Sequence, residues 1–419
     1  MLLAENSSLT MPRLRGVSVT SRRPCPVCNS HEAQYLHTMH FALPETSPLP
    51  ANYNVVVCVR CGSGFADSDA PADAYNEYYQ SFSKYEDSSV ATGGGDDPAD
   101  RQRIEELADF LSGYLPHSAR IVDIGCGNGG LLSTLKNLGF SDLTGFDPSP
   151  ACIAHVQSKG IDAFNITLPL NNMECSSFHP ERPFDLIVLS HVLEHVFDAR
   201  AVLVSLLPLL AVGGRIYIET PDPARYDTHQ FPPFYFFDPE HINHFGKGSL
   251  AFLADSLNLK ILTIDKKTLR LSNGTHYPAV FGLFELSHLN SQREITGESV
   301  YGLLANYLEE SRLGINQLKT RILALIGDGT PFVLWGAGSL AQRLIGESWF
   351  PLDLLQAVVD RDSKKQGLRF AGKTIVSPEI GLRNLPEKTL ILCAAAIATG
   401  RIEQDYCSLG LPYKFHLMV

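Results

Sequence analysis

From about residue 100 onward, the chain alternates short apolar runs with segments whose apolar positions recur at helical spacing. Residues 104–115, IEELADFLSGYL, show the helical spacing, with apolar side chains every three or four positions. The apolar runs that predict strands are Arg120–Ile124, Leu143–Phe146, Phe184–Ser190 and Arg215–Glu219. Because strands that alternate with helices are typical of a doubly wound parallel sheet, we predict an α/β fold.

Three segments depart from this alternation. Residues 67–100 are rich in Asp, Ser, Gly and Tyr, which favours a connector. Residues 220–247 form a Pro- and aromatic-rich insert. Residues 298–326 have apolar positions at helical spacing and predict a helical linker. The sequence PFVLWGAGSLAQRLI that follows predicts a second unit of strand, glycine loop and helix.

Composition bounds the class of protein. The 419 residues are 44% hydrophobic and 19% charged, which is typical of a globular chain of two or three domains. The 34 basic and 45 acidic residues give 34 − 45 = −11, so nucleic acid is not expected as the main partner, although a local basic patch is compatible with this balance. No apolar run is long enough to predict a membrane span, and the N-terminal residues lack the apolar core of a signal peptide. We therefore expect a cytoplasmic protein.

Two CxxC pairs lie close together near the N-terminus, Cys25 with Cys28 and Cys58 with Cys61. Four thiolates in two knuckle-like turns suit tetrahedral Zn²⁺ and leave no open position, so we predict a structural zinc site. An iron centre of the rubredoxin type and a set of four free cysteines are the alternatives. The nine cysteines are an odd number, which also argues against a disulfide framework.

The sequence DIGCGNGG places a glycine loop directly after a predicted strand. Glycine at 125, 127 and 129 lets a ligand approach the backbone, and Asp147 at the end of the next strand can accept hydrogen bonds from two ribose hydroxyls. Binding of NAD and a purely structural loop are the alternatives. Asp123 argues against NAD, because a carboxylate at the strand tip would repel a pyrophosphate, and the spacing from Gly125 is not GxGxxG.

With these motifs, residues 105–262 resemble the class I S-adenosylmethionine-dependent methyltransferases. The resemblance implies that DIGCGNG is the cofactor loop, with Asp123, Gly125 and Gly127 at the cofactor and Asp147 at its ribose. It also implies that Phe164, with Asn165, lies near the adenine.

The order of the motifs is similar to that of the three-domain sugar C-methyltransferases, which act on nucleotide-linked deoxysugars. The resemblance implies counterparts for their catalytic and substrate-binding residues: Tyr79 or Tyr85 in YNEYYQSFSKYED, His195 in SHVLEH, and Glu240 with His241 in DPEHINHF. Two departures stand out. Asp238 replaces a tyrosine of the family's loop, and the C-terminal loop lacks the family's lysine-bearing pattern.

We therefore predict three domains. Residues 1–80 form a zinc-binding domain with a loose N-terminal tail. Residues 81–290 form the class I methyltransferase domain, with a substrate-loop insert at 220–247. Residues 291–419 form the helical linker and a C-terminal Rossmann-like domain that lines the substrate cleft.

The candidate catalytic groups are histidines and carboxylates. Within SHVLEHV, His191, Glu194 and His195 are spaced to share one face of a predicted helix near the sulfur of the cofactor. We expect His195, Glu240, His241 and Tyr85 to be catalytic, His191 to contact the cofactor, and Tyr79 and His244 to bind substrate. A histidine or tyrosine there can take a proton or stabilise an enolate. The alternatives are purely structural: His191 caps the helix, and Glu194 lies on its solvated face. A second metal site of His191, His195, Glu240 and His241 is a further hypothesis. The only pattern that favours it is the i, i+4 spacing of His191 and His195.

The second glycine loop, WGAGSLA, has an acidic partner in Asp360. This is formally a GxGxxA motif, so NAD binding is one interpretation. The resemblance implies instead a domain that helps to form the substrate cleft, with Gly336 and Gly338 at the substrate diphosphate. A glycine loop kept for packing alone is the third interpretation.

The function that we predict is methyl transfer from S-adenosylmethionine to carbon of a nucleotide-linked deoxy- or keto-sugar, with a His/Glu general base. The alternative is O- or N-methylation of another small metabolite or carrier-bound intermediate. A third hypothesis is a non-catalytic module that only binds ligands. The sequence gives no indication of the oligomeric state.

Overall fold

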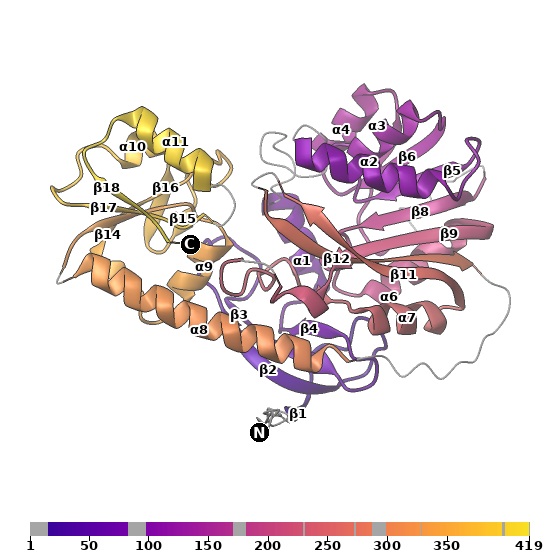
Figure 1. Cartoon of the computed structure of the whole chain (residues 1–419), viewed down its shortest axis with the longest axis horizontal. Coiled ribbons are helices and arrows are strands. Elements are labelled where there is room, and N and C mark those ends of the chain that lie inside the picture. The colour runs from indigo at the N-terminus through magenta and orange to yellow at the C-terminus, as the bar shows by residue number, and fades with distance from the viewer. Residues whose placement is uncertain are drawn as a thin grey trace, which may run out of the picture.

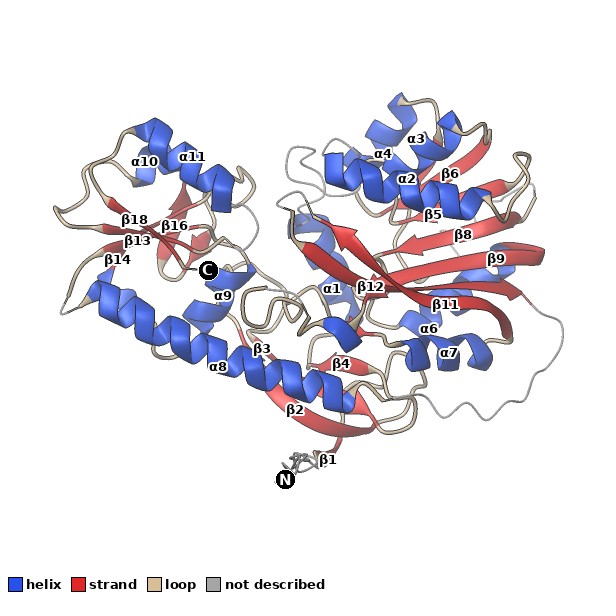
Figure 2. Ribbon diagram, in the orientation of Figure 1, coloured by secondary structure: helices blue, strands red, loops and turns tan. Residues whose placement is uncertain are grey.

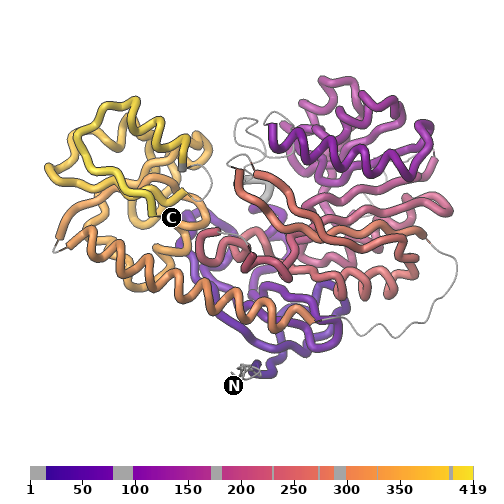
Figure 3. Tube along the Cα trace, viewed as in Figure 1, coloured from indigo at the N-terminus to yellow at the C-terminus, as the bar shows by residue number. Residues whose placement is uncertain are grey.

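The structure is a computed structural model that describes residues 16–82, 98–170, 182–228, 231–271, 274–286, 299–327, 329–395 and 399–418. It contains three sheets (Figures 1 and 2). The helices and strands follow the chain from the N-terminal sheet through the central sheet to the C-terminal sheet (Figure 3). Among the described residues, no helix has the length and apolar character needed to cross a membrane.

The N-terminal sheet is antiparallel and has the order β1-β2-β3-β4-β10. Its members are β1 (Val17–Thr20), β2 (Glu32–His40), β3 (Asn52–Cys58), β4 (Gly64–Asp67) and β10 (Asn243–His244), followed after β4 by helix α1 (Ala72–Phe82). The short β10 comes from the 220–247 insert and pairs with β4. The insert therefore completes the N-terminal sheet, which differs from its predicted place as a loop of the central domain alone.

The central sheet has the order β11-β12-β9-β8-β5-β6-β7. Strands β5 to β9 run parallel, while β12 is antiparallel to both β9 and β11. The strands are β5 (Arg120–Ile124), β6 (Asp142–Asp147), β7 (Asp162–Asn165), β8 (Phe184–Ser190), β9 (Leu210–Pro221), β11 (Leu259–Arg270) and β12 (His276–Leu286). The helices are α2 (Pro98–Ser112), α3 (Gly130–Asn137), α4 (Pro150–Ser158), α6 (Ala199–Leu206) and α7 (Lys247–Ser256). The parallel strands alternate with helices, as the hydrophobic pattern predicted, and form an α/β sheet of the class I methyltransferase type.

The C-terminal sheet has the order β15-β16-β14-β13-β17-β18, and all its pairs are parallel except β15 with β16. Its elements are β13 (Phe332–Trp335), α9 (Ser339–Gly346), β14 (Leu355–Val359), β15 (Arg369–Phe370), β16 (Lys373–Val376), α10 (Pro378–Gly381), β17 (Leu390–Cys393), α11 (Thr399–Leu409) and β18 (Lys414–Leu417). The long helix α8 (Tyr301–Ile326) precedes it and runs past β2 (Figure 1). One buried apolar cluster includes Tyr53, Phe237, Leu308 and Leu334, so the N-terminal sheet, the insert, α8 and the C-terminal sheet share a core.

Candidate functional site

The first glycine loop joins β5 to α3 at the carboxyl edge of the central sheet. Gly125, Gly127 and Gly129 all have positive φ angles, of 67°, 49° and 71°. Among the described residues, no atom beyond the chain neighbours of Gly127 would come within 4 Å of a Cβ built there, so the described part of the chain leaves open space at that point. The Gly127 N–H donates to Asp147 Oδ2 at 2.9 Å, which fixes the acidic residue against the loop.

Asp147 and Asp123 form an acidic pair beside this loop. Asp147 Oδ1 also accepts the N–H of Ser149 at 2.8 Å, so both of its oxygens are held in place. Asp123 is buried, and burial together with the charge of Asp147 raises its pKa to about 7, against the opposing charge of Arg103. Two carboxylates in one buried site favour a ligand that brings hydroxyl donors or a positive charge.

Phe164 lies at the end of β7, next to the acidic pair. Its ring is 36% exposed and meets Phe146 edge-on, with the ring centroids 6.2 Å apart. Asn165 donates from Nδ2 to the backbone oxygen of Asp147 at 3.1 Å. Phe164 thus presents a partly exposed ring near Asp147, and the contact of this ring with an adenine stays a prediction.

The segment 191–198 is a series of turns, and the prediction of a helix over SHVLEHV is wrong. His191 has a positive φ of 57°, which a helix cannot accommodate, and its N–H donates to the backbone oxygen of Glu219. Val192 closes over the first glycine loop, because a Cβ on Gly125 would come within 2.8 Å of Val192 Cγ2. The turns therefore lie against the first glycine loop, and α6 begins only at Ala199.

His191 bridges two buried carboxylates. It donates from Nδ1 to Glu194 at 2.9 Å and from Nε2 to Glu219 at 3.1 Å. Burial opposes protonation, but the two carboxylates outweigh it and raise the pKa of His191 to about 9. Glu219 is also paired with Lys267, which helps to hold its pKa below the usual range despite burial. His191 is thus an internal cation, and Glu194 is buried instead of solvated.

His195, Glu240 and His241 come together, as the sequence predicted for the catalytic groups. His195 donates from Nδ1 to the backbone oxygen of Glu240 at 3.1 Å, and the rings of His195 and His241 lie 4.7 Å apart. Tyr78 donates its hydroxyl to Glu240 Oε1 at 3.3 Å. The insert and the 191–198 turns thus meet in one cluster of titratable side chains.

The predicted tyrosines and Asp238 have different outcomes. Tyr79 is on α1, but its side chain, and the whole of Tyr85, lie outside the described residues. Asp238 accepts the N–H groups of Glu240 and His241 on Oδ1, at 3.0 and 2.7 Å. It therefore shapes the turn that presents Glu240 and His241.

His244 lies in β10 of the N-terminal sheet, and the second glycine loop lies between β13 and α9 of the C-terminal sheet. His244 is 1% exposed, its Nδ1 is 3.0 Å from the Tyr226 hydroxyl, and burial lowers its pKa to about 3. These surroundings suit a neutral packing residue, and its predicted substrate contact stays a prediction. Gly336, with a φ of 103°, and Gly338 precede α9, and no described atom comes within 4 Å of a Cβ built on Gly338.

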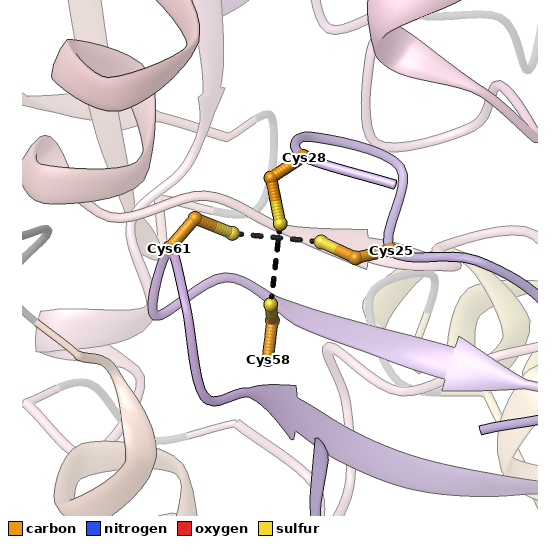
Figure 4. A group of neighbouring side chains, drawn as sticks. All are labelled: Cys25, Cys28, Cys58 and Cys61. Atoms are coloured by element: carbon orange, nitrogen blue, oxygen red, sulfur yellow. Dashed lines mark hydrogen bonds between the residues drawn. The ribbon is translucent and has the colours of Figure 1, made fainter. Parts of the chain in front are cut away.

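The four predicted metal ligands converge in the N-terminal sheet (Figure 4). One Sγ atom from each of Cys25, Cys28, Cys58 and Cys61 lies within 4.8 Å of the others. The Sγ atoms of Cys25 and Cys61 are 3.5 Å apart, and those of Cys28 and Cys58 are 3.4 Å apart. Four sulfurs in this arrangement have the chemistry of a closed tetrahedral thiolate site.

Several residues that support the site were not among the sequence-predicted site residues. Arg23 donates to backbone oxygens of Ala66, Phe197 and Ile242 and to the side chain of Asn243, at 2.6 to 3.0 Å. It therefore ties the cysteine-bearing segment to the 191–198 turns and the insert. Arg23, Tyr78, Glu219, Lys267 and Arg103 all act through partners distant in sequence. Glu219 gave a hint because it ends the predicted strand Arg215–Glu219, and Tyr78 because it lies in the Tyr-rich segment YNEYYQSFSKYED.

The comparisons with known proteins concern the central part of the chain. Residues 99–264 match the family model described as "Methyltransferase domain". The ubiquinone biosynthesis O-methyltransferase of Xylella fastidiosa (strain 9a5c) is 32% identical over 114 residues, which are 27% of this chain and 46% of that protein. That of Aeromonas salmonicida (strain A449) is 31% identical over 124 residues, 28% of this chain and 49% of that protein. The chain spans about half the length of the curated relatives that it matches.

Solved structures are also similar to this chain. The N-methyltransferase NodS from Bradyrhizobium japonicum WM9, in complex with S-adenosyl-L-homocysteine, is 18% identical, with a TM-score of 0.34, and the match covers 46% of this chain and 90% of that one. We assign the central domain from the family match, the sheet order, and the glycine loop with its acidic partner, and not from this solved structure. Residues 99–264 form a methyltransferase domain of the class I, S-adenosylmethionine-dependent type.

Proposed function

We propose that the chain transfers a methyl group from S-adenosylmethionine to a small molecule, at the junction of the first glycine loop and the His195–His241 cluster. The observation that carries the proposal is that Val192 packs on Gly125, so the turns that bear His195 lie against the predicted cofactor loop. A cofactor site and a set of acid–base groups therefore share one edge of the sheet.

The residues at the loop fit S-adenosylmethionine, which supplies an electrophilic methyl group on sulfur. Asp147 would accept the ribose hydroxyls and Phe164 would face the adenine. Asp123 would attract the ammonium group of the methionine part of the cofactor. Arg103, whose charge interacts with Asp123, would attract the carboxylate of the same methionine part. The open space at Gly127 lets the ligand approach the backbone.

The acceptor must lose a proton when its carbon or oxygen is methylated. His195 donates its Nδ1–H to the backbone of Glu240, so its Nε2 carries the lone pair and is able to act as a base. His241 and the carboxylate of Glu240, which Tyr78 orients, are the other proton acceptors within this cluster. One oxygen of Glu194 lies within 4.8 Å of a ring nitrogen of each histidine, and its charge stabilises an imidazolium.

For the acceptor we propose a nucleotide-linked deoxy- or keto-sugar that is methylated at carbon. The support is the order of the three segments: cysteine pairs, methyltransferase domain and a C-terminal sheet with its own glycine loop. In this proposal the C-terminal unit is a Rossmann-like partner, and Gly336 and Gly338 bind the diphosphate. The second candidate is O-methylation of another small metabolite, which the names of the curated relatives favour.

The experiment that tests this function is isothermal titration of the zinc-replete protein with S-adenosylhomocysteine, and then with dTDP and UDP. Micromolar binding of the cofactor product and of a nucleoside diphosphate is the expected result. Binding of the product alone leaves methyl transfer in place and removes the nucleotide-sugar acceptor. No binding of the product contradicts the proposed function as a whole.

We also propose that the four cysteines hold a structural Zn²⁺. The cluster stands at the end of β3, and Arg23, two residues before Cys25, anchors the insert. Removal of zinc is therefore expected to loosen the insert along with the N-terminal sheet. Metal analysis that finds one zinc per wild-type chain, and less than half of that in Cys58→Ser, supports the site. If the analysis finds iron, with absorption in the visible range, the rubredoxin-type centre is supported and the zinc site is contradicted.

A further inference from the structure

Within the described part of the chain, two buried polar atoms in the His195–His241 cluster have no hydrogen-bond partner. They are Oε2 of Glu194 and Nδ1 of His241. Glu194 is only 1% exposed, so its carboxylate is shielded from bulk solvent. Leaving a buried polar group unpaired costs about 1–3 kcal/mol, and more when the group is charged. Two such atoms in one cluster indicate a ligand that binds both.

The donor set points to a cation. One carboxylate oxygen of Glu194 and one ring nitrogen each of His195 and His241 lie within 4.8 Å of one another. Two imidazoles and one carboxylate are the ligands with which proteins hold Zn²⁺ and Fe²⁺ in sites that keep positions open for water or substrate. The four cysteines, by contrast, form a closed set. The protein thus has two different donor sets, in two different places.

The surroundings of the three side chains also suit a metal site. Metal-binding histidines usually donate their second ring nitrogen to a carbonyl or carboxylate, which fixes the lone pair on the first. His195 does this through its bond to the backbone oxygen of Glu240. The other oxygen of Glu194 is held by His191, which is itself held by Glu219. Two of the three donors, those of Glu194 and His195, are therefore held in orientation by hydrogen bonds to neighbouring groups.

We propose that Glu194, His195 and His241 bind one first-row divalent cation of the Zn²⁺, Fe²⁺ or Co²⁺ type, and that this cation holds an oxygen atom of the methyl acceptor. The inference rests on the proposed function and deepens it. It revises the metal site weighed from the sequence, since Glu194 takes the place of His191 and Glu240. Both histidines then act as ligands, and Glu240 remains beside them as the base.

The charges in the cluster say what kind of acceptor this site favours. His191 and Lys267 already balance the buried carboxylates of Glu194 and Glu219. A bound divalent cation therefore adds positive charge that an oxygen with developing negative charge offsets. A hydroxyl or a carbonyl next to an acidic carbon has this property, whereas a simple amine does not.

The test uses Co²⁺ as the probe on full-length protein whose cysteine site is already filled with zinc. We expect one further Co²⁺ per chain, with the d–d absorption of a nitrogen and oxygen site and no thiolate charge-transfer band. His241→Ala and His195→Ala should weaken Co²⁺ binding by more than about 100-fold, since loss of even a supporting partner of a metal ligand costs 10–100-fold. The matched control is His155→Ala, because His155 is an exposed histidine on α4. Its Co²⁺ affinity should equal that of the wild type.

Titration of the same samples with S-adenosylhomocysteine separates the two proposals. If the product binds and Co²⁺ does not, the metal site is overturned while the proposed function stands. Equal Co²⁺ binding by wild type and His241→Ala, or a thiolate charge-transfer band, also overturns the metal site. If the product does not bind, the proposed function fails, whatever Co²⁺ does. Product binding that persists in His241→Ala, together with loss of Co²⁺, supports the inference and shows that the variant is folded.

Discussion

The two glycine loops of this chain have nearly the same hydrogen-bonded frame. In the first, Asp147 accepts the N–H of Gly127 on one oxygen and the N–H of Ser149 on the other. In the second, Asp360 accepts the N–H of Ala337 on one oxygen and the N–H of Asp362 on the other. In both, the acid ends the next parallel strand and the second donor is two residues further on.

The loops differ in the charges around this frame. Two residues before its first glycine, the first loop has Asp123, whereas the second has the buried apolar Leu334. Asp360 has Lys365 within 3.4 Å, so its charge is partly balanced from within the chain. In the first loop, burial and the neighbouring charge of Asp147 raise the pKa of Asp123. A shared backbone frame therefore does not imply a shared ligand, and only the first loop has the charges for a cationic cofactor.

The sharpest way to break this comparison is to remove the acid from each loop. In Asp147→Ala we expect the affinity for S-adenosylhomocysteine to fall about 100-fold or more, because two hydrogen bonds to a charged acceptor contribute roughly 1.5–3 kcal/mol each. Asp360→Ala is the matched control, since it deprives two backbone N–H groups of the same kind of acceptor. Its affinity should equal that of the wild type in isothermal titration. Equal losses in both variants would contradict the assignment of the cofactor to the first loop.

The same contrast shows how far the sequence was informative. The strands and glycine loops were predictable because apolar runs, glycines and a strand-end acid are local patterns. The turns at 191–198 were not predictable. His191 has a left-handed backbone conformation, and its N–H donates to the backbone oxygen of Glu219, which is distant in the sequence. The cluster of His195, Glu240 and His241 was expected from resemblance, but its supports were not. Arg23 acts through carbonyl groups of three distant segments, and such partners leave no periodicity to detect.

Substitution of one glycine in each loop should give the next largest difference. Gly127 has a φ of 49°, so alanine there costs about 1–2 kcal/mol of stability and adds a methyl group where the cofactor would approach the backbone. We expect Gly127→Ala to lower the melting temperature and to weaken product binding at least about tenfold. Gly338 has a negative φ of −89° and open space around it. Gly338→Ala should leave product binding unchanged, and a loss equal to that in Gly127→Ala would show that the loops are not distinct.

The acid that only the first loop possesses predicts a pH dependence. The pKa of Asp123 is raised to about 7, so this carboxyl is mostly neutral at pH 6 and mostly ionised at pH 8. Its attraction for the ammonium group of the product should therefore strengthen binding about tenfold between these pH values. The stability of the free protein has the opposite sign. The unfolded chain releases this proton near its ordinary pKa, so the contribution is present at low pH and is lost as pH rises from about 4 to 7. Asp123→Asn should remove both trends, and a pH dependence that persists in this variant would assign it to another group.

The smallest expected effect concerns the lysine that only the second loop possesses. Lys365 lies 3.4 Å from Asp360 and is about one third exposed, and such ion pairs contribute about 0–1 kcal/mol. We therefore expect Lys365→Ala to change the free energy of unfolding by less than about 1 kcal/mol and to leave the binding of S-adenosylhomocysteine unchanged. The informative measurement is binding of dTDP or UDP by the same variant. If the second loop holds a diphosphate at Gly336 and Gly338, loss of this cation leaves Asp360 unbalanced beside an anion, and the affinity for the nucleotide must fall. An unchanged nucleotide affinity would mean that Lys365 only neutralises Asp360, and that the loop keeps its frame for packing.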